Sequence, residues 1–354
     1  MIKPVAEISI GDRLVGPNQP CFVIAEIGIN HNGDIETAMR MIDAIAESGA
    51  DCVKFQTFRA DGFCSNPDDT YEYISQEKTV RESMLEMFRR VEIPYDDFAG
   101  LFKHARDQGL TVLSTPTDEE AVDALDVLGI EAFKIGSDDI VYTPFLEYIA
   151  KKGKPMIIST GMANSADIDR AVTVIQHCGN SEIIILHCVS QYPTPEEDLN
   201  LLKIVSIKDQ FALQTGFSDH SEGIHAAAAA IAMGSTVIEK HFTLDKNMAG
   251  PDHRFSCDPT ELAELVKTVR QTEKMMGSGD IKPTHEELEM ALISRRSLVA
   301  ATSLPDGHIL CREDVLFQRP GSGLLPYEID RLVGRAIIKP VSSGELFRLE
   351  HFFE

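Results

Sequence analysis

Two lysines inside apolar runs are the first residues whose placement suggests chemistry. Lys54 lies in "CVKFQ" and Lys134 in "AFKIG". In a strand, each lysine would point to the side opposite its large apolar neighbours. Burying a lysine there is unfavourable unless it meets a permanent anion. The pair therefore predicts a bound phosphate or carboxylate, and the alternative is a set of internal salt bridges to Glu26 or Glu239.

Two histidines predict a second wall of the same site. His220 in "GFSDHSEG" and His241 in "IEKHF" are 21 residues apart, about one strand–helix unit, so they are expected at neighbouring strand ends. Two imidazoles with carboxylates nearby are typical of an octahedral divalent-metal site with open positions. The alternative is that His220 belongs to an ordinary polar turn. The carboxylates expected close to the pair are Asp219, Glu239 and Asp252.

An anion-binding site formed by the two lysines, opposite a metal ion, is typical of one class of reaction. A Lewis acid polarises a carbonyl, and the anion-binding site holds an anionic three-carbon donor that can be joined to it.

Eight apolar runs alternate with helix-period segments and must position these side chains. Such alternation predicts parallel strand–helix units, and eight strands close a (β/α)₈ TIM barrel, an α/β fold. An open, doubly wound sheet is the alternative. Because chemistry in barrels sits at the C-terminal strand ends, Ser218 joins the substrate-binding candidates. The runs span residues 21–28, 52–56, 110–116, 132–136, 155–160, 183–188, 211–216 and 235–242.

Two further segments complete the organisation. Residues 58–94 form an insertion after the second strand, with an acidic loop at 66–73 and a helix expected over 78–90, and such insertions cover the active-site face. We expect a barrel domain at 1–280, a linker at 281–294 and a small turn-rich β domain at 295–354. A domain of that size is marginally stable alone and is expected to dock on something.

Composition restricts the partners. The formal charge is −23, which disfavours nucleic acid and anionic membranes, so an anionic substrate must be held by local cations. No uncharged apolar run approaches about 18 residues, so no membrane segment is expected. The seven cysteines form no CxxC pair, which favours reduced thiols in a cytoplasmic protein.

Nine segments in order resemble the sialic acid synthases, the N-acetylneuraminate synthase family that also includes legionaminic and pseudaminic acid synthases. The resemblance spans nearly the whole chain, and the last sixty or so residues resemble its antifreeze-like (SAF) domain. The segments are "AEIGINHNG", "ADCVKFQTF", "STPTD", "FKIGSDD", "STGMA", "HCVSQYPTP", "GFSDHSEG", "IEKHFTLDKNMAGPDH" and "RRSLVA" with "RPGSG".

The resemblance implies a reaction and its partners. Phosphoenolpyruvate would condense with an N-acylated amino sugar, in the first place N-acetylmannosamine, to give N-acetylneuraminate, a nine-carbon 2-keto acid, and phosphate. Legionaminic or pseudaminic acid synthesis is the alternative. A divalent metal would be held by His220 and His241, usually Mn²⁺, with Mg²⁺ or Co²⁺ as alternatives. The protein would be a domain-swapped homodimer.

The resemblance also assigns residues. Family contacts to phosphoenolpyruvate carry over to Lys54, Gln56, Thr115, Lys134, Ser137 and Ser159, while Ser190 and Tyr192 lie near the substrates. Acidic residues that orient water or the sugar match Glu26, Glu239 and Asp252. Arg319 matches an arginine that reaches the partner's site and contacts the N-acyl group. One departure is Asp138-Asp139, where the family has Gly-Glu or something close, which leaves the role of Asp139 open.

Two other functions compete with this interpretation. A metal-dependent aldolase, or a synthase that takes a phosphorylated sugar, would share the fold. The phosphorylated sugar would need a second basic cluster, and only Arg59 and residues 151–154 offer one. An ice-binding protein would need a flat, uncharged face. Arginines are instead spread through the C-terminal domain at Arg312, Arg319, Arg331, Arg335 and Arg348.

Overall fold

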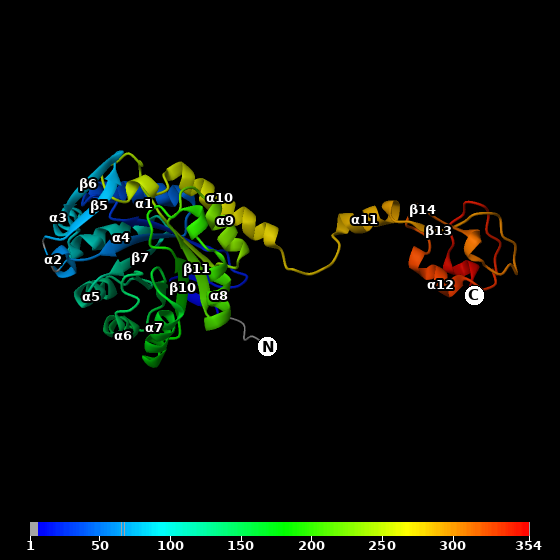
Figure 1. The fold of residues 1–354 in the computed structure, drawn as a ribbon, viewed down its shortest axis with the longest axis horizontal. Coiled ribbons are helices and arrows are strands. Elements are labelled where there is room, and N and C mark those ends of the chain that lie inside the picture. The colour runs from blue at the N-terminus through cyan, green and yellow to red at the C-terminus, as the bar shows by residue number, and fades with distance from the viewer. Residues whose placement is uncertain (1–5, 65, 67, 354) are drawn as a thin grey trace. The chain divides into compact units, whose positions relative to one another are not determined.

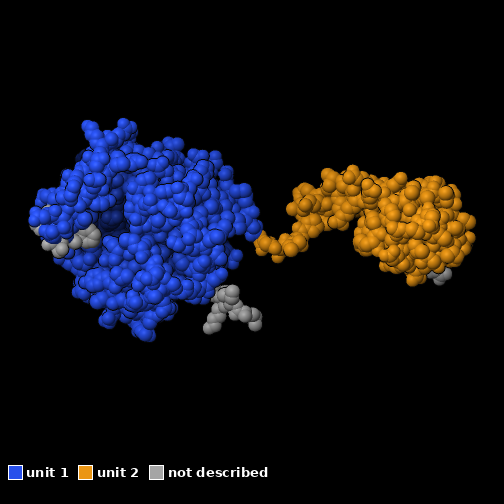
Figure 2. All heavy atoms as spheres, viewed as in Figure 1, with its two compact units in different colours: residues 1–277 blue, residues 278–354 orange. Residues whose placement is uncertain are grey.

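The chain folds into two compact units in a computed structural model that describes residues 6–64, 66 and 68–353. Unit 1 is Met1–Gly277 and unit 2 is Ser278–Glu354 (Figure 2). The division falls just before the predicted linker, and part of that linker, His285–Ser294, forms helix α11. Among the described residues, no helix combines the length and apolar character that crossing a bilayer requires.

Unit 1 is a closed barrel of eight parallel strands, which confirms the predicted fold class (Figure 1). A helix follows each strand along the chain. The strands are β3 (Phe22–Gly28), β4 (Cys52–Thr57), β7 (Thr111–Pro116), β8 (Phe133–Ile135), β9 (Met156–Ser159), β10 (Ile183–Cys188), β11 (Gln214–Asp219) and β12 (Val237–His241). The helices are α1 (Ile35–Ser48), α4 (Phe98–Asp107), α5 (Glu119–Val127), α6 (Thr143–Ala150), α7 (Ser165–His177), α8 (Leu202–Phe211), α9 (His225–Ala232) and α10 (Pro259–Met276).

Alternation along each strand divides the barrel into two cores. Val53 and Phe55 of β4 pack outward in the large cluster shared with the surrounding helices. Cys52 points inward, and it belongs to a second cluster that fills the barrel interior. Because strand side chains alternate, Lys54 follows Cys52 to the inside.

A hairpin closes the N-terminal end of the barrel. Strands β1 (Ile8–Ile10) and β2 (Arg13–Val15) pair antiparallel. Their buried residues Ile8, Ile10 and Val15 join the interior cluster. This hairpin was not among the predicted elements, and it fills the barrel at the end opposite the site.

The insertion after β4 differs from the prediction. The helix expected over 78–90 was wrong in its first half: β6 (Lys78–Ser83) pairs antiparallel with β5 (Thr70–Ser75), and α3 (Met84–Val91) begins only after the Ser83 N-cap. The predicted acidic loop is partly strand β5, and its Pro67 lies outside the described residues. A short helix, α2 (Ala60–Phe63), precedes the hairpin, and single 3-10 turns occupy Tyr95–Asp97, Glu196–Asp198 and His253–Phe255.

The seventh barrel strand lies later than predicted. Phe211 ends helix α8, and Ala212 caps it in a left-handed conformation with φ 53°. The strand runs on through Ser218 and Asp219, which pair with Glu239 and Lys240 of β12. Alternation therefore turns Asp219 away from Ser218, and the expectation that Asp219 lies beside the histidine pair was wrong.

Asp219 instead forms a buried ion pair with Lys240, whose Nζ lies 2.9 Å from Asp219 Oδ2. Both side chains are fully buried. Removing one partner leaves an uncompensated buried charge, which destabilises by about 3–5 kcal/mol. We therefore expect Lys240→Met to lower the free energy of unfolding by that amount in urea titrations. Lys103→Met, which removes an exposed pair with Asp107, should change it by under about 1 kcal/mol. Equal losses in the two variants would contradict the prediction.

Unit 2 is a small, turn-rich domain with its own core. After α11, strands β13 (Ser297–Ala300) and β14 (Val315–Gln318) pair antiparallel, and helix α12 spans Ile329–Leu332. Buried apolar residues such as Leu298, Leu332 and Phe347 form the core. Single 3-10 turns occupy Arg312–Asp314, Pro326–Glu328 and Leu349–His351.

Candidate active site

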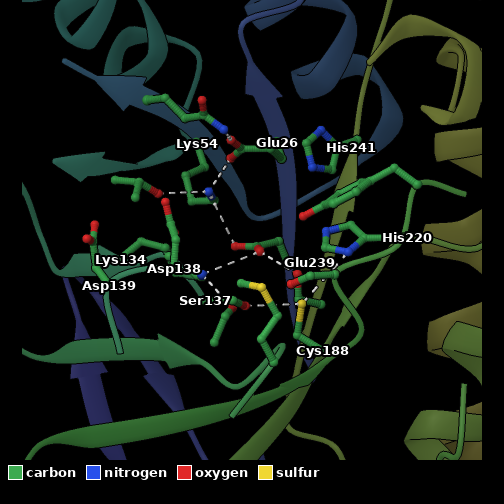
Figure 3. A pocket seen from close by; sticks show the side chains of 18 of the residues that line it. Glu26, Lys54, Lys134, Ser137, Asp138, Asp139, Cys188, His220, Glu239 and His241 are labelled. Atoms are coloured by element: carbon green, nitrogen blue, oxygen red, sulfur yellow. Dashed lines mark hydrogen bonds and ion pairs between the residues drawn. The ribbon is translucent and has the colours of Figure 1, made fainter. Parts of the chain in front are cut away.

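A cavity of about 460 Å³ lies among the C-terminal ends of the barrel strands. It brings together most of the residues predicted for the site, from every strand of the barrel or the loop that follows it (Figure 3). The predicted residues that line it are Glu26, Lys54, Gln56, Thr115, Lys134, Ser137, Ser159, Ser190, Tyr192, Ser218, His220, Glu239 and His241.

The two lysines form a charged network with two carboxylates. Lys54 Nζ lies 2.5 Å from Glu26 Oε2 and 3.6 Å from Glu239 Oε2. Lys134 Nζ lies 3.7 Å from Glu239 Oε1 and donates to Ser159 Oγ at 2.6 Å. The internal salt bridges considered as an alternative are therefore present. They do not exclude an anion, because the same lysines line the cavity.

The two carboxylates differ in proton affinity. Burial raises the pKa of Glu26 to about 7, against the opposing effect of Lys54. Burial would raise the pKa of Glu239 too, but Lys134 and Lys54 outweigh it and lower that pKa to about 2. Glu239 is thus the permanent counter-charge of both lysines, whereas Glu26 can exchange a proton near neutral pH.

The histidines lie side by side, with ring centroids 5.4 Å apart. His220 Nδ1 donates to the Val189 carbonyl at 2.9 Å, so Nε2 is the ring nitrogen left to bind an ion. Burial would lower the pKa of His220 but Cys188 raises it, so an ion bound at Nε2 would displace a proton. His241 Nδ1 is buried and has no hydrogen-bond partner among the described residues. Burial and the charges of His220 and Lys54 hold the pKa of His241 well below its usual value, so its imidazole is neutral.

Both imidazoles therefore fit a divalent ion. Among the described residues, no group of three His, Cys, Asp or Glu side chains is placed to hold a metal. A two-histidine clamp would leave most coordination positions to water or substrate, as catalytic ions require.

Two predicted site residues lie elsewhere. Asp252 does not line the main cavity, because its loop places it in an adjoining side cavity, where Oδ2 is 3.9 Å from His241 Nδ1. Burial raises the pKa of Asp252 to about 6. Arg319 is an exposed residue of unit 2 and is not among the residues that line the cavity.

Other lining residues were missed or left open. Asp139 lines the cavity, and burial and Asp138 raise its pKa to about 7. Cys188, Met162 and Tyr71 also line it. Tyr71 belongs to the segment expected to be an acidic loop. It alternates with Tyr73, on whose ring it stacks, and this alternation could have predicted a strand with both rings on one face.

Comparison with known proteins agrees with this geometry. The NeuB family model matches residues 41–281, and the SAF domain model matches residues 295–352. The chain is 41% identical over 329 residues to N,N'-diacetyllegionaminic acid synthase from Campylobacter jejuni, covering 92% of this chain and 98% of that protein. It is 38% identical over 340 residues to N-acetylneuraminate-9-phosphate synthase from Homo sapiens, covering 94% and 93%.

A solved structure extends the similarity to the fold. The crystal structure of N-acetylneuraminic acid synthetase from Leptospira borgpetersenii in complex with citrate matches with a TM-score of 0.74 and 34% identity. The match covers 81% of this chain and 95% of that chain. The chain therefore belongs to the NeuB family of phosphoenolpyruvate-dependent nonulosonic acid synthases, with a C-terminal SAF domain.

Proposed function

We propose that this protein condenses phosphoenolpyruvate with an N-acylated amino sugar and water, giving a nonulosonic acid and phosphate. The observation that carries the proposal is one cavity in which two buried lysines share space with two adjacent histidines. The acceptor is N-acetylmannosamine or a 6-deoxy diamino sugar. The second acceptor is a candidate because a legionaminic acid synthase is among the similar relatives.

The lysines would bind the donor. Lys54 and Lys134 face its phosphate and carboxylate, with hydroxyl and amide groups from Gln56, Thr115, Ser137 and Ser159 around them. A divalent ion held by His220 and His241, most simply Mn²⁺, would supply Lewis-acid polarisation of the sugar aldehyde. Tyr192, whose ring packs against His220, and Ser190, which lines the same cavity, would orient the sugar.

The bond changes follow from this placement. The C3 carbon of phosphoenolpyruvate attacks the aldehyde carbon, and the aldehyde oxygen takes a proton from solvent, which is returned when water adds at C2. Positive charge develops at C2, and the negative carboxylates of the cavity stabilise it. Water adds to C2 and passes a proton to Glu26, whose pKa of about 7 suits a general base. The hemiketal phosphate then expels phosphate, so that the C2–O bond breaks.

A labelling experiment tests the proposal. Phosphoenolpyruvate carrying ¹⁸O at the bridging oxygen should release phosphate only when the acceptor sugar is present, and all of the label should appear in that phosphate. Label in the keto acid before solvent exchange would mean attack at phosphorus, and acceptor-independent release would indicate a phosphatase. A metal-dependent aldolase would release no phosphate.

A phosphorylated acceptor has little support. The cations that could bind its phosphate already have partners, since Arg59 pairs with Glu92 and the lysines at 151–154 pair with carboxylates. Ice binding has little support either, because the arginines at positions 312, 319, 331, 335 and 348 of unit 2 are exposed.

The donor should bind less tightly as Glu26 ionises. Below pH 7 the Glu26 carboxyl is neutral, and above it a negative charge lies beside Lys54 and repels the bound anion. We expect the KM for phosphoenolpyruvate to rise roughly tenfold between about pH 6.5 and 8.5. In Glu26→Gln the KM for phosphoenolpyruvate should vary much less with pH. The remaining variation should come only from ionisation of the phosphate ester itself. Superimposable profiles would contradict the assignment.

Arg319 is proposed to act across a domain-swapped homodimer, as the resemblance implies. Its charge-assisted contact to the N-acyl group is worth about 1.5–3 kcal/mol, so Arg319→Ala should raise the acceptor KM about 10- to 100-fold. Mixing Arg319→Ala with His220→Ala under subunit-exchange conditions should restore activity in some hybrid sites. A mixture as inactive as its parts would refute action in trans.

A further inference from the structure

A side cavity of about 190 Å³ adjoins the main cavity. Four residues line both spaces and so mark where they meet: Gln56, Tyr71, Tyr192 and His241. Five others line the side cavity but not the main cavity: Ile29, Met87, Phe88, Pro251 and Asp252. Pro251 and Asp252 also line a third pocket, which Arg254 lines as well. A molecule held at His241 can therefore extend one end into this space.

The walls of the side cavity are mostly apolar and firmly held. Ile29 and Met87 are buried, and the Phe88 ring packs against Phe58 with centroids 5.2 Å apart. The insertion that supplies Tyr71 and Met87 is tied to the loop that precedes Asp252. Gly250 N donates to Ser75 Oγ at 3.1 Å, and Gln76 Nε2 donates to the Asn247 carbonyl at 3.0 Å.

The charge in the side cavity is negative. Asp252 is the carboxylate there, and no lysine or arginine is among the described residues that line it. A phosphate ester carries about two negative charges at neutral pH, so it would meet repulsion and no cation. An apolar group fits the remaining walls, since burying it removes apolar surface from water.

We propose that this side cavity receives the end of the acceptor sugar farthest from its aldehyde, and that it favours a methyl-terminated, 6-deoxy sugar. This inference rests on the proposed function, which places the aldehyde at the histidine pair and the N-acyl group toward Arg319. A sugar with its aldehyde at the histidine pair can extend its far end into the space beside His241. The side cavity thus sets acceptor specificity through Met87 and the walls next to it.

Three matched acceptors test the proposal: N-acetylmannosamine, its 6-deoxy analogue and its 6-phosphate. They differ only at C6, and phosphate release from phosphoenolpyruvate gives kcat/KM for each. We expect kcat/KM for the 6-deoxy sugar to be about tenfold higher than for N-acetylmannosamine. An apolar pocket can discriminate to this extent against an added hydroxyl. The kcat/KM for the 6-deoxy sugar should be at least about 100-fold higher than for the 6-phosphate.

Variants locate the effect. Met87→Gln keeps the side-chain length and adds a polar amide, so it should bring the ratio of 6-deoxy to 6-hydroxy sugar close to one, while the KM for phosphoenolpyruvate stays the same. Met87→Leu keeps the wall apolar and should keep the preference, which guards against a folding defect in the first variant. Met275→Gln, at an exposed position of α10, is the matched control.

The outcomes separate the two proposals. If neither these three sugars nor a 6-deoxy diamino sugar supports phosphate release, the proposed function fails. If release occurs but does not depend on C6, or the 6-phosphate is preferred, the side cavity has been assigned wrongly and the proposed function stands. A preference that survives Met87→Gln in a folded protein would also overturn the assignment.

Discussion

Replacing the metal-binding candidate His241 by alanine is expected to lower kcat/KM at least about 1,000-fold relative to the wild type. This equals about 4 kcal/mol of transition-state stabilisation that His241 provides. Its imidazole is one of two that face the cavity, and no third protein ligand is in place to compensate among the described residues. Metal content should fall with activity. Wild-type protein treated with EDTA should be equally inactive and should recover with Mn²⁺, Co²⁺ or Mg²⁺.

The control for this variant is His225→Ala, which removes an exposed histidine at the start of α9. It should bind metal and turn over as the wild type does. The wild type should also gain thermal stability when metal is added, and His241→Ala should lose that gain, which gives a readout that does not depend on turnover. Full activity of His241→Ala in EDTA would eliminate the metal site.

Lys134→Met is expected to raise the KM for phosphoenolpyruvate by two to three orders of magnitude. A cation about 4 Å from an anion is worth about 4 kcal/mol at an effective dielectric of about 20. Lys134 is one of two lysines in the cavity, and burial lowers its own pKa in the absence of an anion. A bound donor would give the Lys134 ammonium a second counter-charge besides Glu239, which is why the loss should appear in donor binding first.

Lys152→Met is the matched control for this second prediction. Lys152 Nζ pairs with Asp123 Oδ1 at 2.6 Å, outside the cavity, so its loss should leave both KM values unchanged. The metal content of Lys134→Met should equal that of the wild type. An unchanged KM for phosphoenolpyruvate in Lys134→Met would show that the donor binds elsewhere.

Much of the site could be predicted because strand alternation fixes which side chains share a face. Lys54 and Lys134 interrupt apolar runs, and this pattern alone indicated that they point into the barrel. The pairing of both lysines with Glu239, and the separation of the pKa values of Glu26 and Glu239, depend on distances between strands that are far apart in sequence. No spacing within one segment encodes those distances.

The two errors in the predicted secondary structure each have an identifiable cause. Lys78–Ser83 contains good helix formers, and it becomes a strand only because Thr70–Ser75 pairs with it, as in the hydrogen bond from Tyr73 Oη to Glu82. Ala212 takes a left-handed conformation that alanine rarely adopts, so the true start of β11 was hidden. In the first segment a contact with another strand overrode local preference, and in the second a single residue adopted a backbone conformation that its type disfavours.

The hairpin of β1 and β2 has a consequence for the order of events during turnover. Because it fills the N-terminal end of the barrel, the cavity is closed at that end and lies at the C-terminal ends of the strands. Lys54 and Lys134 lie buried within the cavity, while the half-exposed Tyr192 lies nearer solvent. A sugar bound beside Tyr192 would lie between the lysines and solvent and would hinder the entry of a donor after it. Turnover should therefore follow a compulsory order: donor first and sugar second.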